Sequence, residues 1–157
     1  MSKEQYVFDY PFETVLKGFW HKYPHPDLSF VKDNFVLSYD IIDEQTLHVK
    51  RLMYSKMYKY LWCYTIEDIK IYFDKRAMEM KSKIIKTSSM FPPTGQAVEL
   101  ISYKALEDFK TVYEKSIQGT EEGFIKKYAK KFNNTFQKGC QIIEENCKKI
   151  TEEMKSN

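Results

Sequence analysis

The sequence has few cysteines, and their spacing argues against a disulfide framework. The chain of 157 residues contains three cysteines, at positions 63, 140 and 147. Cys140 and Cys147 lie on one predicted helix, where seven residues rise about 10 Å, too far for a disulfide bond. We therefore interpret the cysteines as small buried hydrophobic side chains.

Strong net charge and long hydrophobic runs are also lacking. The net charge is only +3 although 30% of the residues are charged, which does not favour nucleic acid as a partner. No apolar run approaches about 18 residues, so no membrane-spanning helix is predicted. The first ten residues lack the apolar core of a signal peptide and the arginine-rich composition of a presequence, so we expect the mature protein to begin at Met1.

Motifs of catalysis and metal binding are missing as well. The sequence contains no G-x-S-x-G, H-E-x-x-H or P-loop pattern. His21 and His25 are four residues apart, but Pro24 breaks the helix that would align them, so no metal site is predicted. We therefore expect neither an enzyme nor a cofactor.

What is present suits a single globular domain over residues 1–157. Hydrophobic residues make up 43% of the chain and aromatic residues 16%, which is enough for a sizeable core. Residues 4–10 are predicted to form a strand, and an apolar face at helical spacing predicts a helix from Phe12 to Tyr23, ended by two prolines. Alternating apolar residues predict six further strands, at 35–41, 46–54, 64–73, 77–86, 97–106 and 108–117.

From Glu122 onward, apolar residues recur at spacings of three and four. This pattern predicts one long amphipathic helix of about 48 Å. An antiparallel sheet of six to seven strands around such a helix is the helix-grip architecture of the α+β class, in which a cavity can lie between sheet and helix. Residues 54–62 fit the alternation less well, and we interpret them as a bend, a short helix or a lid.

Arg51 is the most informative single residue. It alternates with Val49 and Met53 along strand 46–54, on a face that is otherwise apolar. A buried guanidinium requires a counter-charge. Two alternatives stay open: a structural role, as a buried arginine–glutamate pair or on a strand face that is simply exposed, and a site for an anionic ligand.

Lysines add further basic groups near the predicted cavity. Lys127, Lys131 and Lys138 lie within about 40° of one another around the final helix. Lys22 follows the first helix, where a cation also suits the helix C-terminus. A solvated edge and a helix dipole would explain these lysines individually, whereas their convergence on an apolar cavity would form a phosphate headgroup site.

The segment YVFDYPFETVLKGFWHKYPHP, residues 6–26, resembles the start of the PRELI-domain family, which includes the slowmo proteins. Members share a VF-x-x-PWETV-like helix start and a KYPNP helix stop, where this chain has Phe12 for the usual Trp and His25 for the Asn. Three later segments resemble family segments in the same order: LHVKRLM, AMEMKSKIIKTSSM and FQKGCQIIE.

This resemblance implies a START-like phospholipid transfer protein of the mitochondrial intermembrane space, which carries phosphatidic acid or phosphatidylserine. The cargo lipid takes the place of a cofactor, and the implied protein partner is a small helical hairpin of the twin C-x9-C type. The family's headgroup-binding positions correspond here to Lys22, Arg51, Lys131 and Lys138.

In the family, a longer lid follows the strand that carries Arg51, whereas here only about ten residues occupy this space. The implied lid and membrane contacts are Tyr54, Lys56, Met57, Tyr58, Tyr60 and Trp62, whose types suit a membrane interface. The short lid also supports an alternative function, a scaffold with a vestigial pocket that binds the hairpin partner without transferring lipid.

Overall fold

The computed structural model describes the backbone of residues 2–58, 61–88, 98–118 and 122–157. Side chains are described for residues 3–56, 62–88, 98–118 and 135–157. No helix in these ranges is long and apolar enough to cross a membrane.

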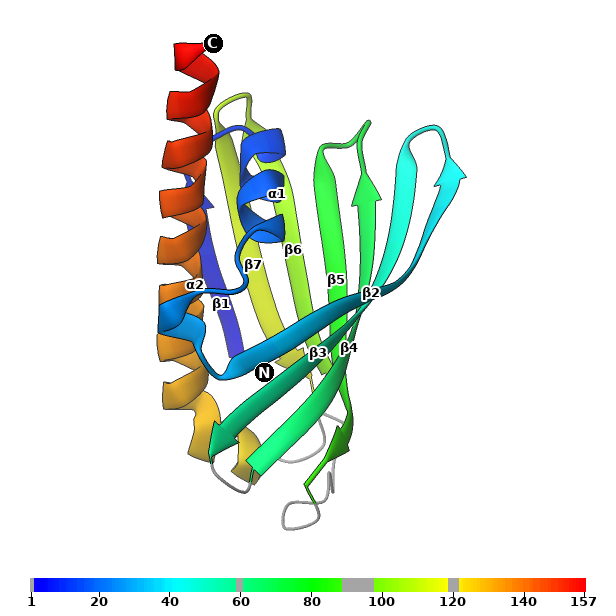
Figure 1. Cartoon of the computed structure of the whole chain (residues 1–157), viewed down its shortest axis with the longest axis vertical. Coiled ribbons are helices and arrows are strands. Elements are labelled where there is room, and N and C mark those ends of the chain that lie inside the picture. Colours follow the sequence, from blue (N-terminus) through cyan, green and yellow to red (C-terminus); the bar gives the residue numbers. More distant parts are fainter. Residues whose placement is uncertain (1, 59–60, 89–97, 119–121) are drawn as a thin grey trace.

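Seven antiparallel strands form one curved sheet in the described part of the chain, and two helices lie against it (Figure 1). The elements are β1 (Ser2–Phe8), α1 (Phe12–Trp20), the 3-10 helix η1 (Pro26–Leu28), β2 (Val31–Asp43), β3 (Thr46–Tyr58), β4 (Leu61–Tyr72), β5 (Ala77–Thr87), β6 (Val98–Glu107), β7 (Lys110–Gln118) and α2 (Glu122–Ser156). The strand order β1-β7-β6-β5-β4-β3-β2 places β1 and β2 at the two edges. The predicted helix-grip architecture is therefore confirmed.

The predicted lid at residues 54–62 is instead the end of a β-hairpin. β3 continues to Tyr58 and β4 begins at Leu61, with Tyr54 opposite Tyr64 and Lys56 opposite Trp62. Aromatic residues favour strands, and their cross-strand pairing extends the ladder. The interpretation as a bend, helix or lid is therefore wrong for the described residues, while residues 59–60 lie outside them.

The first helix ends earlier than its prolines predicted, because a side chain of α2 satisfies its final carbonyl groups. The Asn146 amide donates to the carbonyl oxygen of Gly18 at 3.0 Å and to that of His21 at 3.3 Å. Carbonyl groups at a helix C-terminus need such external donors. The end of α1 is thus fixed against the long helix.

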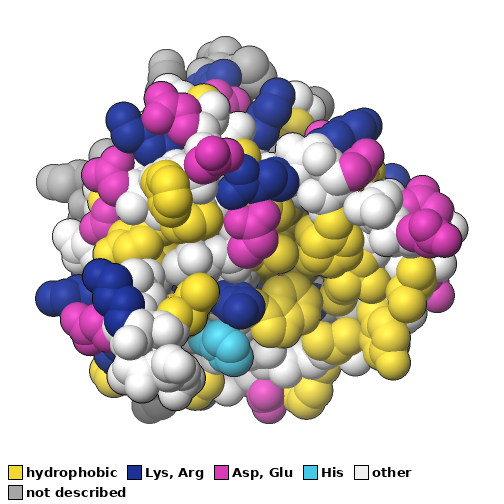
Figure 2. Space-filling model, turned by 90° about the horizontal axis from the view of Figure 1, so that it is seen from above, with side chains coloured by type: hydrophobic (Ala, Val, Ile, Leu, Met, Phe, Trp, Pro, Cys, Tyr) yellow, Lys and Arg dark blue, Asp and Glu magenta, His cyan; other side chains and the backbone are white. Residues whose placement is uncertain are grey.

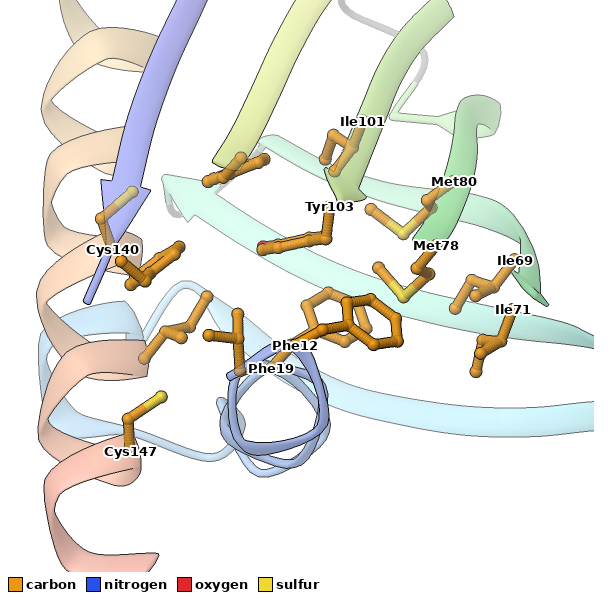
Figure 3. Close-up of a cluster of buried hydrophobic side chains, with 14 of the residues drawn as sticks. Phe12, Phe19, Ile69, Ile71, Met78, Met80, Ile101, Tyr103, Cys140 and Cys147 are labelled. Atoms are coloured by element: carbon orange, nitrogen blue, oxygen red, sulfur yellow. The ribbon is translucent and has the colours of Figure 1, made fainter. Parts of the chain in front are cut away.

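The core lies between the sheet, α1 and the C-terminal half of α2, as the close-up in Figure 3 shows. Phe12 and Phe19 of α1 pack there with Tyr103 of β6. Cys140 and Cys147 are completely buried, and burial is the main cause that raises the pKa of each thiol to about 12. The interpretation as buried hydrophobic side chains is confirmed for these two cysteines and is wrong for Cys63, which is only partly buried.

Gly18 permits the close approach of the two helices. A Cβ atom at this position would lie 3.1 Å from the carbonyl oxygen of Ile143 and 3.2 Å from the Cys147 sulfur. The equivalent atom at Gly139 of α2 would meet only the end of the Lys22 side chain, at 3.1 Å. The first contact involves rigid backbone, while the second involves a flexible side chain.

We expect Gly18→Ala to lower the free energy of unfolding by about 1 kcal/mol, because overpacking against the backbone outweighs the gain in helix propensity. Gly139→Ala is the matched control and should leave stability unchanged or raise it. Urea denaturation of both variants measures this difference, and equal destabilisation of the two would contradict the proposed helix contact.

Arg76 ties the start of α1 to two turns at the end of the sheet. Its guanidinium donates to both carboxylate oxygens of Glu13, at 2.9 and 3.0 Å, and to Asp108 at 3.4 Å. The hydrogen bond from Arg76 is the main cause that lowers the pKa of the Glu13 carboxyl group.

A lowered pKa in the folded state means that Glu13 stabilises the protein above its unfolded-state pKa. This contribution is lost as the pH falls through the lowered folded-state value. We therefore expect Glu13→Gln to lower the melting temperature at about pH 7 but to leave it nearly unchanged at about pH 3. A melting temperature lowered equally at both pH values would show that the ion pair is not the cause.

Candidate ligand site around Arg51

Arg51 lies on the inner face of β3, as the alternation of its strand predicted. Its side chain is buried between those of Val49 and Met53, and the residue is only 3% exposed. The neighbouring strands place Val36 and Glu67 directly opposite it. The prediction that this guanidinium points into the protein is confirmed.

The counter-charge of Arg51 comes from the protein itself. The Arg51 Nε donates to the Glu67 carboxylate at 2.7 Å, and Glu67 is also buried. Of the alternatives that the sequence left open, the structure therefore contains the arginine–glutamate pair. Removing either partner would leave an uncompensated charge in the core.

This ion pair does not occupy the whole guanidinium. The Arg51 Nη2 atom is buried and has no hydrogen-bond partner among the described residues. Three rings surround the group, with Cζ lying 5.3 Å from the ring centroid of Phe19, 5.4 Å from that of Trp20 and 6.0 Å from that of Tyr23. These rings stabilise the cation, and an unsatisfied buried donor suits an anionic ligand.

Lys22 belongs to the same site. Its amino group lies 5.2 Å from the centre of the Tyr23 ring and passes over Gly139, where a side chain would collide with it. Burial would lower the pKa of this lysine, but Tyr23 and the carboxylates of Glu67 and Glu99 outweigh burial and raise the pKa. The amine is therefore a second cation near Arg51.

The other two predicted headgroup residues are not joined to this site by any described contact. Lys138 is exposed on α2. The side chain of Lys131 lies outside the described residues, so its role stays a prediction. Of the predicted lid contacts, the side chains of Met57, Tyr58 and Tyr60 also lie outside the described residues.

The interior contains a second ion pair that was not predicted from the sequence. Lys115 of β7 is 7% exposed, and its amino group lies 3.5 Å from the Glu99 carboxylate of β6. The alternation of Tyr113, Lys115 and Ile117 would have identified this lysine by the same argument as Arg51. Glu67 would likewise have been found, because it alternates with buried isoleucines along β4.

An open apolar groove of about 560 Å³ lies between α1 and strands β2, β3 and β4. It is lined by Leu16, Lys17, Trp20, His21, Val36, Tyr39, Leu47, Val49, Ile71 and Phe73. Figure 2 shows a hollowed hydrophobic surface at this end of the molecule.

A bulge in β2 helps to create the groove. The register shifts between Val36 and Ser38, so Val36 and Tyr39 both face inward although they are three residues apart. Trp20 connects the groove to the arginine, because its ring lies against the guanidinium and also lines the groove. Trp20 is thus the contact between the apolar groove and the buried cation.

The predicted cavity beneath α2 is not seen where the side chains of that helix are described. From Phe136 to Cys147, its inward residues belong to the packed core. The described groove lies instead against Leu16, Lys17 and Trp20 of α1, whereas Gly18 of α1 faces α2. The side chains of residues 122–134 are outside the described ranges, so a cavity beside them stays a prediction.

The described residues do not form a recognisable metal site. No group of three or more His, Cys, Asp or Glu side chains among these residues is arranged to hold a metal ion. His25 instead accepts a hydrogen bond from the backbone N–H of Asp27 at 3.1 Å. His48 pairs with Asp68 in the sheet.

No protein-family model matches this chain. Solved structures with a similar fold include the 18 kDa protein CC1736 from Caulobacter crescentus, with a TM-score of 0.64 and 11% identity over 97% of this chain and 99% of that chain. A START superfamily protein from Mycobacterium smegmatis gives a TM-score of 0.59 and 10% identity, covering 95% of this chain and 97% of that one. The crystal structure of Ara h 8.0201 gives a TM-score of 0.60 and 10% identity, covering 93% of this chain and 95% of that one. These similarities show the START and Bet v 1-like helix-grip fold.

We expect Glu67→Ala to lower the free energy of unfolding by about 3–5 kcal/mol, because Arg51 would lose its counter-charge. The double variant R51M/E67M removes both charges and should recover most of this loss. Chemical denaturation of the single and double variants checks this coupling. A double variant as unstable as E67A would contradict it.

Proposed function

We propose that this chain is a START-like carrier that binds an anionic phospholipid and transfers it between mitochondrial membranes. One observation carries the proposal: a buried guanidinium, whose Nη2 atom has no hydrogen-bond partner among the described residues, lies against the Trp20 ring, and Trp20 also lines an open apolar groove. An anionic amphipathic molecule matches both features, because its acidic head would bind Arg51 while its apolar chain occupies the groove.

The charge of the site supports an acidic ligand, and the size of the groove suits a small apolar group such as an acyl chain. Volumes of about 300–1,000 Å³ are typical of small-molecule sites, and the groove has about 560 Å³. Lys22, Arg51 and Lys115 are three cations around the carboxylates of Glu67 and Glu99, so one positive charge is left for a phosphate group. Carriage requires no bond to be broken, and the buried thiols, with pKa values of about 12, are poor nucleophiles.

Three features of this proposed function are implied by the resemblance to PRELI-domain proteins. They are the intermembrane-space location, phosphatidic acid or phosphatidylserine as cargo, and a twin C-x9-C hairpin protein as partner. Within this proposal Lys131 and Lys138 belong to the headgroup site. Lys138 is exposed, so it would reach a headgroup only at the surface.

A second candidate function is a scaffold that binds the hairpin partner without carrying lipid. The observation that favours it is the ion pair, since Glu67 already neutralises Arg51. The open groove would then receive an apolar helix of the partner rather than an acyl chain. Helices in grooves are a common mode of peptide recognition.

The headgroup role of Arg51 is tested by R51M/E67M, which removes the cation without leaving an unpaired carboxylate. We expect phosphatidic acid binding to weaken by about tenfold to a hundredfold, as for the loss of a charge-assisted hydrogen bond. Lys50→Met is the matched control, because Lys50 is exposed on the opposite face of the same strand. Unchanged binding by folded R51M/E67M would refute this site.

Native mass spectrometry separates the two candidate functions. A carrier purified in its folded state should retain a phospholipid mass, and Tyr39→Glu should abolish it by placing a charge in the groove. Tyr39 is 70% exposed, so this variant is expected to fold. A wild-type chain that binds the hairpin protein through the groove but never retains or transfers lipid would favour the scaffold.

A further inference from the structure

The outer face of the sheet carries an unexpected cluster of apolar side chains at one end of β3 and β4. Arg51 and Met53 are buried on the inner face, so Leu52 and Tyr54 project from the outer one. Cross-strand pairing extends this outer row to both neighbouring strands. We name the set the outer patch: Phe35, Leu52, Tyr54, Trp62, Tyr64 and Ile66.

The aromatic members of the outer patch pack against one another. The rings of Tyr54 and Tyr64 are stacked with centroids 5.0 Å apart, and Trp62 meets Tyr64 edge-on at 5.7 Å. All three residues are only partly buried, and Phe35 is 48% exposed. The aromatic cluster is thus ordered by its own contacts while one side stays open.

Such a patch is unusual for this position in a sheet. The face of an antiparallel sheet turned away from the core is normally polar. Contiguous exposed apolar surface on a soluble domain marks an interaction site more often than scattered apolar residues do. The outer patch therefore indicates something that binds to the convex face.

The charges around the outer patch identify the kind of partner. Lys86 lies opposite Tyr64, Lys83 opposite Ile66, and Lys56 opposite Trp62. These three lysines and Lys32, at the bulge beside Asp33, are exposed. None of the four forms an ion pair with a described residue.

Toward the other end of β3, β4 and β5, the outer face carries both acidic and basic side chains. Lys50 lies opposite Asp68, His48 opposite Lys70, and Glu79 opposite Lys70 on its other side. Among the described residues, the acidic side chain that lies directly opposite a member of the outer patch is Asp33, which pairs with Tyr54. Positive charge is therefore concentrated where the aromatic rings are.

We propose that the outer patch is a docking surface for an anionic lipid bilayer. Tyr and Trp rings prefer the headgroup region of a membrane, and lysines around them gain free energy near anionic lipids. This docking role deepens the proposed function, because a carrier must contact the membranes that it serves. It differs from the predicted lid, since Tyr54, Lys56 and Trp62 act here from paired strands of the sheet.

The docking surface and the cargo site lie on opposite faces of the same strands. Arg51 and Leu52 are consecutive, and the first faces inward while the second faces outward. Substitutions in the outer patch therefore change side chains that point away from Arg51. The two roles are separable by experiment.

Docking is tested with the whole chain and vesicles of phosphatidylcholine with or without phosphatidylglycerol, which supplies negative charge without being the proposed cargo. We expect co-sedimentation with the anionic vesicles only. K83E/K86E should weaken it by at least about tenfold, and W62T/Y64T should weaken it at equal net charge. K70E/K104E is the matched control, since it makes the same charge change at exposed lysines outside the patch.

Trp62 offers a second readout that does not depend on affinity. The chain has two tryptophans, so Trp20→Phe leaves Trp62 as the single reporter. Its emission should shift to the blue on anionic vesicles if the ring enters the headgroup region. Vesicle binding without this shift, or undiminished in folded K83E/K86E and W62T/Y64T, would overturn the proposal.

Two further outcomes separate docking from carriage. If the R51M/E67M variant docks normally but carries no lipid, the docking surface and the cargo site are independent. If the wild-type chain docks on vesicles but never carries lipid, the proposed carrier function is refuted while membrane docking is supported. Outer-patch variants that lose a protein partner while they bind vesicles like wild type would assign this face to that partner and refute membrane docking.

Discussion

The ion pair between Arg51 and Glu67 joins the parts of this structure that form the candidate site. It connects β3 to β4 inside the core, and the rings of Phe19 and Trp20 bring the end of α1 onto the guanidinium. A shift of β3 by one residue would move Arg51 to solvent and expose its apolar neighbours. The pair therefore specifies the strand register, although a buried ion pair adds little net stability compared with apolar side chains.

The geometry of arginine explains how one residue can serve both structure and binding. A guanidinium carries five N–H donors in a plane, and Glu67 engages it at Nε. Nη2 stays without a partner among the described residues. A lysine at this position would present a single ammonium group and could not divide its donors in this fixed way. Glu67 thus holds the cation in place while a donor is still available.

The sequence was sufficient for the architecture and for the direction of Arg51, because both follow from local periodicity. It was insufficient for features that depend on distant contacts. The end of α1 is fixed by Asn146, far along the chain, and the inward position of Tyr39 depends on a bulge in β2. The choice of Glu67 as partner requires the register of β3 against β4, which alternation within one strand does not contain. Residues 54–62 interrupt the alternation of apolar and polar side chains, so the sequence predicted a bend, a short helix or a lid, whereas the pairing of Tyr54 with Tyr64 that extends the hairpin depends on the neighbouring strand.

The two faces of β3 and β4 suggest how a sheet of this kind divides its tasks. Inward residues near Arg51 are packed or paired, so substitutions there change the core as well as the site. Outward residues near Tyr54 contribute little to the core and are free to be selected for an external surface. Lys50 and Lys56 illustrate the distinction, since both are outward and exposed, yet only Lys56 lies beside aromatic rings. An apolar outer face is a liability for solubility unless it is covered, and a surrounding set of lysines restricts the partners that would cover it to acidic ones.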